Sequence, residues 1–364
     1  MRFKTISTTE TAITHGNYRF ISIAVSAHFL CSSAVNAFTI YLTMQLSIRR
    51  VLPLSVALVS STLAAQSPPP IQPIATRASA TLHVRGYADF LVLHNEKAWV
   101  TNQGRVELLA PNDSVPVATV PIAEPCGAMA IEFGALWVVN CRAKTLARVD
   151  LATTRLVTEI ATGVADPSGE LSVATGAGSV WLLSDSTGVL SRIDPATNKV
   201  IARITVQPHS FAAVFGFGSV WISTTGRKGA VGAGSVQRID PATNRVIATI
   251  AVGPTPRFLA AGEGGVWTLN QGDGTVSRID PARNALAATI QTAVPGGGGD
   301  IATGAGRVWV RAKTIMLQVI DPKRNVVIER YGPIAGSGAV RANERNVWVT
   351  AHDIHTVWVL PPRK

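Results

Sequence analysis

Short runs of β-branched and apolar residues alternate with turn residues along most of the chain, with a period of roughly forty residues. In the period around Trp267, the pattern predicts an inner strand at 258–261 and further strands at 265–269, 275–279 and 285–290. Val, Ile, Thr and Trp fit a pleated surface, and the intervening Gly and Pro set turns. Signals for helices are poor, so we expect an all-β chain.

A tryptophan marks each period of this pattern. Seven of them recur at intervals of 38 to 46 residues: Trp99, Trp137, Trp181, Trp221, Trp267, Trp309 and Trp348. Four strands in about 40 residues are typical of one β-propeller blade. The sequence therefore predicts a seven-bladed β-propeller of four-stranded blades over residues 80–364, with the tryptophans as wedges between blades rather than ligand platforms.

A second phrase, Arg-Ile-Asp-Pro-Ala-Thr-Asn or a close variant, occupies residues 192–198, 238–244 and 278–284. Asp at the start of a turn can accept backbone N–H groups, Pro presets φ, and Asn tolerates left-handed φ. A turn explains these aspartates completely, so we do not expect them to be catalytic.

The last repeat lacks a fourth strand. It supplies an inner strand from Ala339 and strands at 346–350 and 355–360, and then the sequence stops. Residues 80–86 match the fourth-strand phrase at 248–253. We therefore expect the N-terminal strand to pair with 355–360 and complete the last blade, a 3+1 clasp that covers a sheet edge.

The N-terminal region has the pattern of an export signal. Two arginines follow Met44, and an apolar run at 51–63 and small residues come next, as in a secretory signal. The apolar stretch at 20–43 is long enough for a transmembrane helix. Because the segment from Met44 is complete as a signal, we interpret residues 1–43 as an over-extended reading frame.

This gives a domain plan of three parts. Residues 1–65 form a leader, with the signal at 44–65, and residues 66–79 form a Pro-rich disordered spacer before the propeller. We expect a periplasmic or extracellular monomer with no transmembrane anchor in the mature chain. The net charge of +11 falls to +7 without the leader, and the basic residues are scattered, so we do not expect nucleic acid as a partner.

Two cysteines, Cys126 and Cys141, lie in the predicted mature chain, and an even count in an exported protein favours a disulfide. With Phe133-Gly134 as a two-residue turn, the two cysteines would lie directly opposite each other on adjacent strands. Opposed residues have Cα atoms about 4.5–5.5 Å apart, within disulfide range.

The Gly-x-Val-Trp strands and the Arg-Ile-Asp-Pro-Ala-Thr-Asn turns resemble those of YVTN-type propellers and the related virginiamycin B lyase (streptogramin lyase) superfamily. The resemblance covers residues 80–362 and implies a propeller that is either a binding protein or an enzyme. A lyase of this kind would use a histidine base, an acidic partner and Mg²⁺ at the channel mouth. His209 would be the base, with Glu170 or Asp300 as the acid.

Polar residues just before the inner strands would converge on one mouth of the central channel. They are Asp89, Glu170, His209, Arg257 and Asp300. Their mixed signs suit a polar or zwitterionic small ligand better than a polyanion. A wet channel entrance would tolerate the same residues without any ligand.

Two further motifs fall on the same face. His352 and His355 could bind a metal ion only with a third ligand that the sequence does not identify, and the alternative is a solvated turn. The Gly-rich loop at 225–234 lacks the Gly-Lys-Ser/Thr ending of a phosphate loop. With no catalytic motif, we favour a propeller that binds a ligand or partner protein through its channel face; the alternative is the lyase-like enzyme.

Overall fold

The computed structural model describes residues 6–15, 18–27, 68–113, 115–162, 170–184, 187–226, 234–292 and 296–362. The chain divides into two compact units, residues 1–65 and 66–364. In the first unit, β1 (Ile6–His15) and β2 (Tyr18–Ala27) form an antiparallel hairpin. The signal predicted at 44–65 lies outside the described residues.

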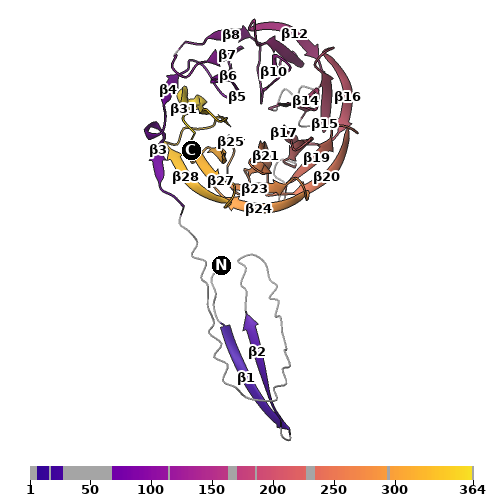
Figure 1. Cartoon of the computed structure of the whole chain (residues 1–364), viewed down its shortest axis with the longest axis vertical. Helices are drawn as coiled ribbons and strands as arrows, with labels where there is room; N and C mark the ends of the chain where they lie inside the picture. Colours follow the sequence, from indigo (N-terminus) through magenta and orange to yellow (C-terminus); the bar gives the residue numbers. More distant parts are fainter. Residues whose placement is uncertain are drawn as a thin grey trace. The chain divides into compact units, whose positions relative to one another are not determined.

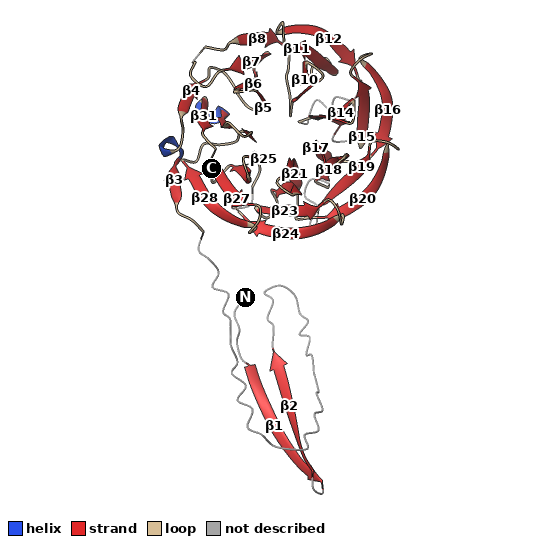
Figure 2. Cartoon of the chain, in the orientation of Figure 1, coloured by secondary structure: helices blue, strands red, loops and turns tan. Residues whose placement is uncertain are grey.

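Seven antiparallel sheets arranged in a ring form the second unit, which confirms the predicted seven-bladed propeller (Figures 1 and 2). Blades 1 to 3 are β5 (Leu91–His94), β6 (Lys97–Asn102), β7 (Arg105–Leu109) and β8 (Ala118–Pro121); β9 (Ala130–Glu132), β10 (Ala135–Asn140), β11 (Thr145–Asp150) and β12 (Arg155–Ala161); and β13 (Ser172–Gly176), β14 (Ser179–Ser184), β15 (Val189–Asp194) and β16 (Lys199–Thr205).

Blades 4 to 6 are β17 (Ser210–Gly216), β18 (Ser219–Thr224), β19 (Ser235–Asp240) and β20 (Arg245–Ala251); β21 (Pro256–Gly262), β22 (Gly265–Asn270), β23 (Thr275–Asp280) and β24 (Ala285–Gln291); and β25 (Gly299–Gly304), β26 (Arg307–Ala312), β27 (Leu317–Asp321) and β28 (Val326–Gly332). Blade 7 contains β29 (Val340–Ala342), β30 (Val347–Ala351), β31 (Thr356–Leu360) and β4 (Ala80–His83). The described residues contain no α-helix, only the 3-10 turns η1 (Ile74–Thr76) and η2 (His352–Ile354).

The turns have the chemistry that the repeat predicts. Asp194, Asp240 and Asp280 accept the N–H of the second residue after them at 2.8–3.0 Å, and these bonds help to hold their pKa values below the usual range. The asparagines that end the three turns have φ of 51–57°. The aspartates are therefore turn residues, as predicted.

The seven repeat tryptophans are buried, with at most 1% of each side chain exposed. In blades 2 to 5 an arginine of the third strand stacks on its own blade's tryptophan, with 4.9–5.2 Å from Cζ to the ring centroid. The same arginine donates to the Pro carbonyl and the Asn side chain of the next blade's turn, as Arg238 does to Pro281 and Asn284. This inter-blade arginine contact gives the Arg in the repeat phrase a structural role.

The N-terminal strand β4 pairs with β31 as the incomplete last repeat predicts. The register runs from His83 opposite Thr356 to Ala80 opposite Val359, so blade 7 has four strands. The effect of this pairing on the stability of the closed ring stays a prediction.

The described part of the spacer, residues 68–79, differs from the expectation of disorder. Its β3 (Ile71–Pro73) pairs in parallel with β28 as a fifth strand of blade 6, and the Ile74 side chain is buried in a cluster with Tyr331 and Trp358. Composition alone predicted an extended, unpartnered segment. It did not reveal that the edge of blade 6 would supply backbone partners and that an apolar site would hold Ile74.

Candidate functional site

The five predicted site residues lie at one end of the inner strands. Asp89, Glu170 and His209 precede β5, β13 and β17, while Arg257 and Asp300 are the second residues of β21 and β25. Neighbouring inner strands start in parallel, as the Ala128–Ser172 bridge shows. Because the five residues occupy equivalent positions in the repeat, they lie at the same end of the ring.

Asp89 is the electrostatic centre of this end. Burial, followed by the nearby carboxylates of Glu170 and Asp300, raises its pKa to about 7, while the Arg311 guanidinium acts in the opposite direction. Its Oδ1 lies 3.8 Å from Nε2 of His352. The structure thus brings the acids of blades 1, 3 and 6 within electrostatic reach of one another.

Asp300 has a different environment from Asp89. Its side chain is 2% exposed and ion-paired with Arg341, and its carboxylate accepts the N–H groups of Val340 and Ile301. Burial raises its pKa, and Arg341 opposes the shift. Asp300 therefore joins blade 6 to blade 7 and contributes negative charge behind Asp89.

His209 and Arg257 lie in blades 4 and 5. His209 has φ of 63°, and its carbonyl accepts the N–H of Thr225 at 3.0 Å. The Arg257 guanidinium lies 4.5 Å from the ring centroid of Phe211. Arg257 thus packs on an aromatic ring of the neighbouring blade, and the His209 backbone is bonded to the loop that follows β18.

Three phenylalanines pack together next to these polar residues. The rings of Phe211 and Phe258 meet edge to face at 5.2 Å, and Phe90 lies 6.5 Å from Phe258. Phe90 directly follows Asp89, and Phe258 directly follows Arg257. Rings from blades 1, 4 and 5 therefore form an aromatic cluster beside the polar channel end.

Sequence reasoning missed two residues near Asp89, Tyr87 and Arg311, and did not place His352 beside it. The fully buried Arg311 of β26 donates to the carbonyls of Thr350, Ala312, Ala335 and Ser337, and burial lowers its pKa to about 10. Tyr87 contacts His352: its hydroxyl lies 3.1 Å from Nε2, and the ring centroids are 4.0 Å apart.

The turn at 352–355 is solvated as predicted at Asp353, Ile354 and His355, which are exposed, but not at His352. His352 is only 5% exposed, burial lowers its pKa, and its Nδ1 lies 2.7 Å from Oδ1 of Asp353. Nδ1 of His355 contacts the carbonyl of Gly86 at 2.6 Å, so the two histidines face different partners. His352 is buried because it packs against the strand entry of blade 1, where Tyr87 lies, a contact made by the ring closure between distant segments.

Gly86 allows the chain to reach this position. It has φ of 96°, and a Cβ there would lie 2.3 Å from Oδ1 of Asn102. That oxygen accepts the N–H of Tyr87 at 2.6 Å. Asn102 thereby fixes the backbone of Tyr87, whose ring packs on His352.

A cleft of about 420 Å³ opens beside Asp89. Its lining includes Tyr87, Asp89 and Phe90 from the start of blade 1, and Glu124, Arg142 and Glu170 from the opposite wall. The Glu124 carboxylate lies 3.8 Å from the exposed Arg142 guanidinium. The cleft thus combines acidic, basic and aromatic groups.

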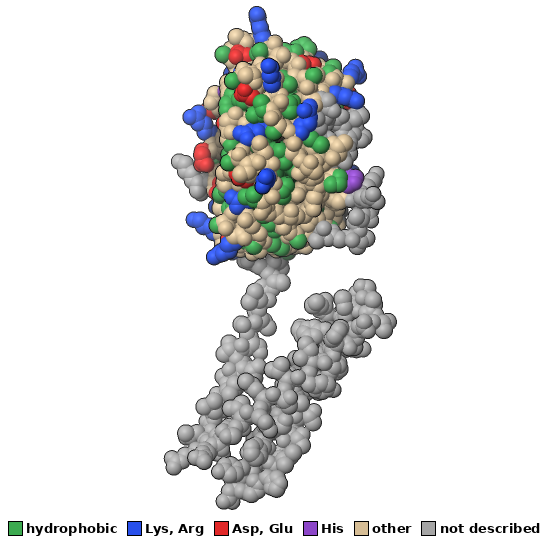
Figure 3. Space-filling model, turned by 90° about the vertical axis from the view of Figure 1, so that its right-hand side faces the viewer, with side chains coloured by type: hydrophobic (Ala, Val, Ile, Leu, Met, Phe, Trp, Pro, Cys, Tyr) green, Lys and Arg blue, Asp and Glu red, His purple; other side chains and the backbone are tan. Residues whose placement is uncertain are grey.

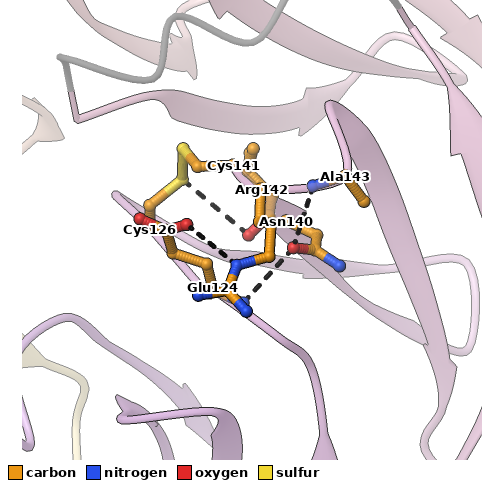
Figure 4. The surroundings of a disulfide bond; sticks show 7 residues. Glu124, Cys126, Asn140, Cys141, Arg142 and Ala143 are labelled. Atoms are coloured by element: carbon orange, nitrogen blue, oxygen red, sulfur yellow. Dashed lines mark hydrogen bonds and ion pairs between the residues drawn. A yellow bond between two sulfur atoms is a disulfide. The ribbon is translucent and has the colours of Figure 1, made fainter.

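The Cys126–Cys141 disulfide fixes one wall of the cleft (Figure 4). The bridge is present as predicted, with Cα atoms 6.0 Å apart, but the two residues are not directly opposite. Cys141 donates its N–H to Glu124, and the N–H of Cys126 bonds to Val139.

This two-residue change of register begins at Gly127. Gly127 has φ of 76°, and a Cβ there would lie 1.7 Å from the Leu171 carbonyl oxygen. The next residue, Ala128, bridges to Ser172 of blade 3 instead of to its own hairpin. Turn counting assumed an unbroken ladder and could not detect this departure.

A second cavity of about 320 Å³ lies along the central channel. It is lined by later inner-strand residues such as Ala130, Thr175 and Val214, together with Arg341. None of its lining residues belongs to the cleft beside Asp89. The cleft beside Asp89 is therefore distinct from this cavity.

Further observations bear on partners. Lys and Arg side chains are scattered over the face shown in Figure 3. The described residues include no helix long and apolar enough to cross a membrane. Across the same residues, no three His, Cys, Asp or Glu side chains are grouped closely enough to hold a metal ion.

Comparison with known proteins finds a matching repeat family and solved structures with a similar fold. A family model described as "Repeat of unknown function (DUF6923)" matches residues 92–235, from β5 to the start of β19. No curated protein sequence matches the chain. The Pan2 WD40 domain of Neurospora crassa is 11% identical over 77% of this chain and 90% of that one, with a TM-score of 0.61.

Hydrazine synthase of Kuenenia stuttgartiensis is similar in structure at 12% identity, over 76% of this chain and 96% of that one, with a TM-score of 0.65. Sequence identities this low support a shared fold but not a shared activity. The comparisons therefore show a β-propeller that contains a repeat of unknown function.

Proposed function

We propose that this protein is an exported propeller that binds a small polar ligand on its channel face, in the cleft beside Asp89. The observation that carries the proposal is the cleft itself, where acids from separate blades meet aromatic side chains around about 420 Å³ of space. Concave sites with a few convergent polar groups and a shifted pKa are typical of ligand binding.

Export is supported by the leader pattern and by the disulfide. A disulfide is compatible with an oxidising compartment such as the periplasm or the extracellular space. The bridge also stiffens the wall that carries Glu124 and Arg142. A rigid wall lowers the cost of ordering the site when a ligand binds.

A thermal-shift screen of the full chain against amines, amino acids, sugars and carboxylic acids tests this proposal. A ligand at 100 times its Kd stabilises the folded state by about 2.7 kcal/mol. Hits should bind more weakly to Glu170→Gln, while the control Glu263→Gln, in the hairpin turn at the other end of β21, should bind them normally. A screen without hits, or hits unaffected by Glu170→Gln, would exclude the cleft.

The lyase-like alternative rests on the resemblance, with His209 as base, Glu170 or Asp300 as acid and Mg²⁺ as cofactor. Since no three candidate donors are grouped among the described residues, these residues do not form a ready site for the ion, and we derive no step through it. His209→Asn keeps a residue that tolerates left-handed φ. Loss of turnover with retained binding in that variant would favour the lyase.

A further inference from the structure

The cleft beside Asp89 contains more acidic than basic side chains. Among its lining residues are Asp89, Glu124 and Glu170, and one basic residue, Arg142. The buried Arg311, whose positive charge acts on Asp89, directs its guanidinium to four backbone carbonyls. Negative charge therefore dominates the side of the cleft where Asp89 and Glu170 lie.

Aromatic side chains line the same cleft. Tyr87 packs one face on His352 and still exposes 42% of its surface, and Phe90 lies directly after Asp89. A cation within about 6 Å of an aromatic face is attracted by the ring quadrupole. Arg257 over Phe211 shows that this end of the channel already holds a cation against a ring.

We propose that the cleft binds an organic cation, whose ammonium group lies between the carboxylates of Asp89 and Glu170 and contacts the rings of Tyr87 and Phe90. This inference rests on the proposed function and specifies its ligand class. A carboxylate ligand would be repelled by the same acids, and a neutral ligand would gain nothing from their charge. A zwitterion gains an additional partner in Arg142.

Binding of a cation should depend on pH because Asp89 must be ionised. The groups around it are Tyr87, Glu170, Asp300, Arg311, His352 and Asp353. Of these, His352 has a lowered pKa and is neutral near pH 7, so it does not replace the ligand's charge. Below pH 7 the ionised fraction of Asp89 falls about tenfold per pH unit, and the affinity should fall with it.

Calorimetric titration of the full chain with n-butylammonium tests the ligand class. The comparison probes are 1-pentanol, which is neutral and one methylene longer, and pentanoate, which is anionic and has a carboxylate on the same butyl chain. At pH 8 we expect n-butylammonium to bind at least about tenfold more tightly than either probe. Its affinity should decrease between pH 7 and pH 5, while any weak binding of 1-pentanol should not change.

Asp89→Asn should weaken n-butylammonium binding at least about tenfold at pH 8 and remove the pH dependence. Tyr87→Leu should weaken binding at every pH and keep the pH dependence. The control Glu96→Gln removes an exposed carboxylate in the turn after β5, at the opposite end of that strand, and should bind like the parent. Thermal unfolding of each variant shows that it is folded.

The outcomes separate the two proposals. If 1-pentanol or pentanoate binds as tightly as n-butylammonium and Asp89→Asn abolishes that binding, the cleft is a ligand site but the cation inference is wrong. If n-butylammonium binds equally to the parent and to Asp89→Asn, the inference is also wrong. If no probe binds and the wider screen gives no hits, the proposed function itself fails.

Discussion

Replacing Arg238 by alanine should destabilise the propeller through the loss of one inter-blade arginine contact. Arg238 stacks on Trp221 at 4.9 Å and donates at 2.7 Å to both Pro281 and Asn284, so it ties blade 4 to blade 5. Each hydrogen bond from a charged donor contributes about 1.5–3 kcal/mol and the stacking about 0.5–1 kcal/mol. With a discount for partial exposure, we expect a loss of about 2–4 kcal/mol.

Urea unfolding followed by tryptophan fluorescence measures this loss. The matched control is Arg245→Ala, which removes an exposed arginine at the start of β20 in the same blade and should change stability by less than about 0.5 kcal/mol. Asn284→Gly removes the acceptor but keeps a residue suited to φ of 51°. Equal midpoints for Arg238→Ala and Arg245→Ala, or no coupling between Arg238→Ala and Asn284→Gly, would refute the inter-blade role.

Three further predictions concern stability. The raised pKa of Asp89 means that the folded state holds a proton that the unfolded state releases, so stability should decline as pH rises from about 4 to about 7; Asp89→Asn should remove this decline and raise the melting temperature at pH 8 but not at pH 4. Reducing Cys126–Cys141, which closes a loop with a sequence separation of 15, should cost about 3 kcal/mol in urea unfolding, and mass mapping of oxidised protein should find both thiols blocked. Ile74→Ala should cost about 2–5 kcal/mol, whereas the exposed Ile71→Ala should cost far less; equal melting temperatures would mean that the segment before β4 does not contribute to the fold.

Much of the fold could be predicted because the repeat carries it in local signals. Strand bounds in blade 5, the turn residues and the buried tryptophans follow from residue types at fixed spacing, such as Asp280 and Asn284 around one turn. Such short-range chemistry acts within a few residues and is readable in one sequence. The role of the repeat arginines was not predicted, because their partners lie 43 to 52 residues away in the next blade.

The candidate site was predicted only in part for the same physical reason. Alignment to the tryptophans located the starts of the inner strands, and so Asp89, Glu170 and Asp300. It could not show that Asp300 would be buried and ion-paired with Arg341. Tyr87 and Arg311 were missed, and His352 was considered only as a possible metal ligand, because ring closure, not local pattern, brings these side chains to Asp89.

If Asp89 holds the ligand in the cleft of the channel face, its carboxyl must titrate differently with and without the ligand. The most direct test is a ¹³C NMR titration of the Asp89 carboxyl in the full chain, assigned with Asp89→Asn, alone and saturated with n-butylammonium. We expect the Asp89 titration to have its midpoint near pH 7 in the free protein and at a clearly lower pH in the saturated protein, since a bound cation favours the carboxylate. A free midpoint in the ordinary range near 4, or one that does not move on saturation, would contradict it.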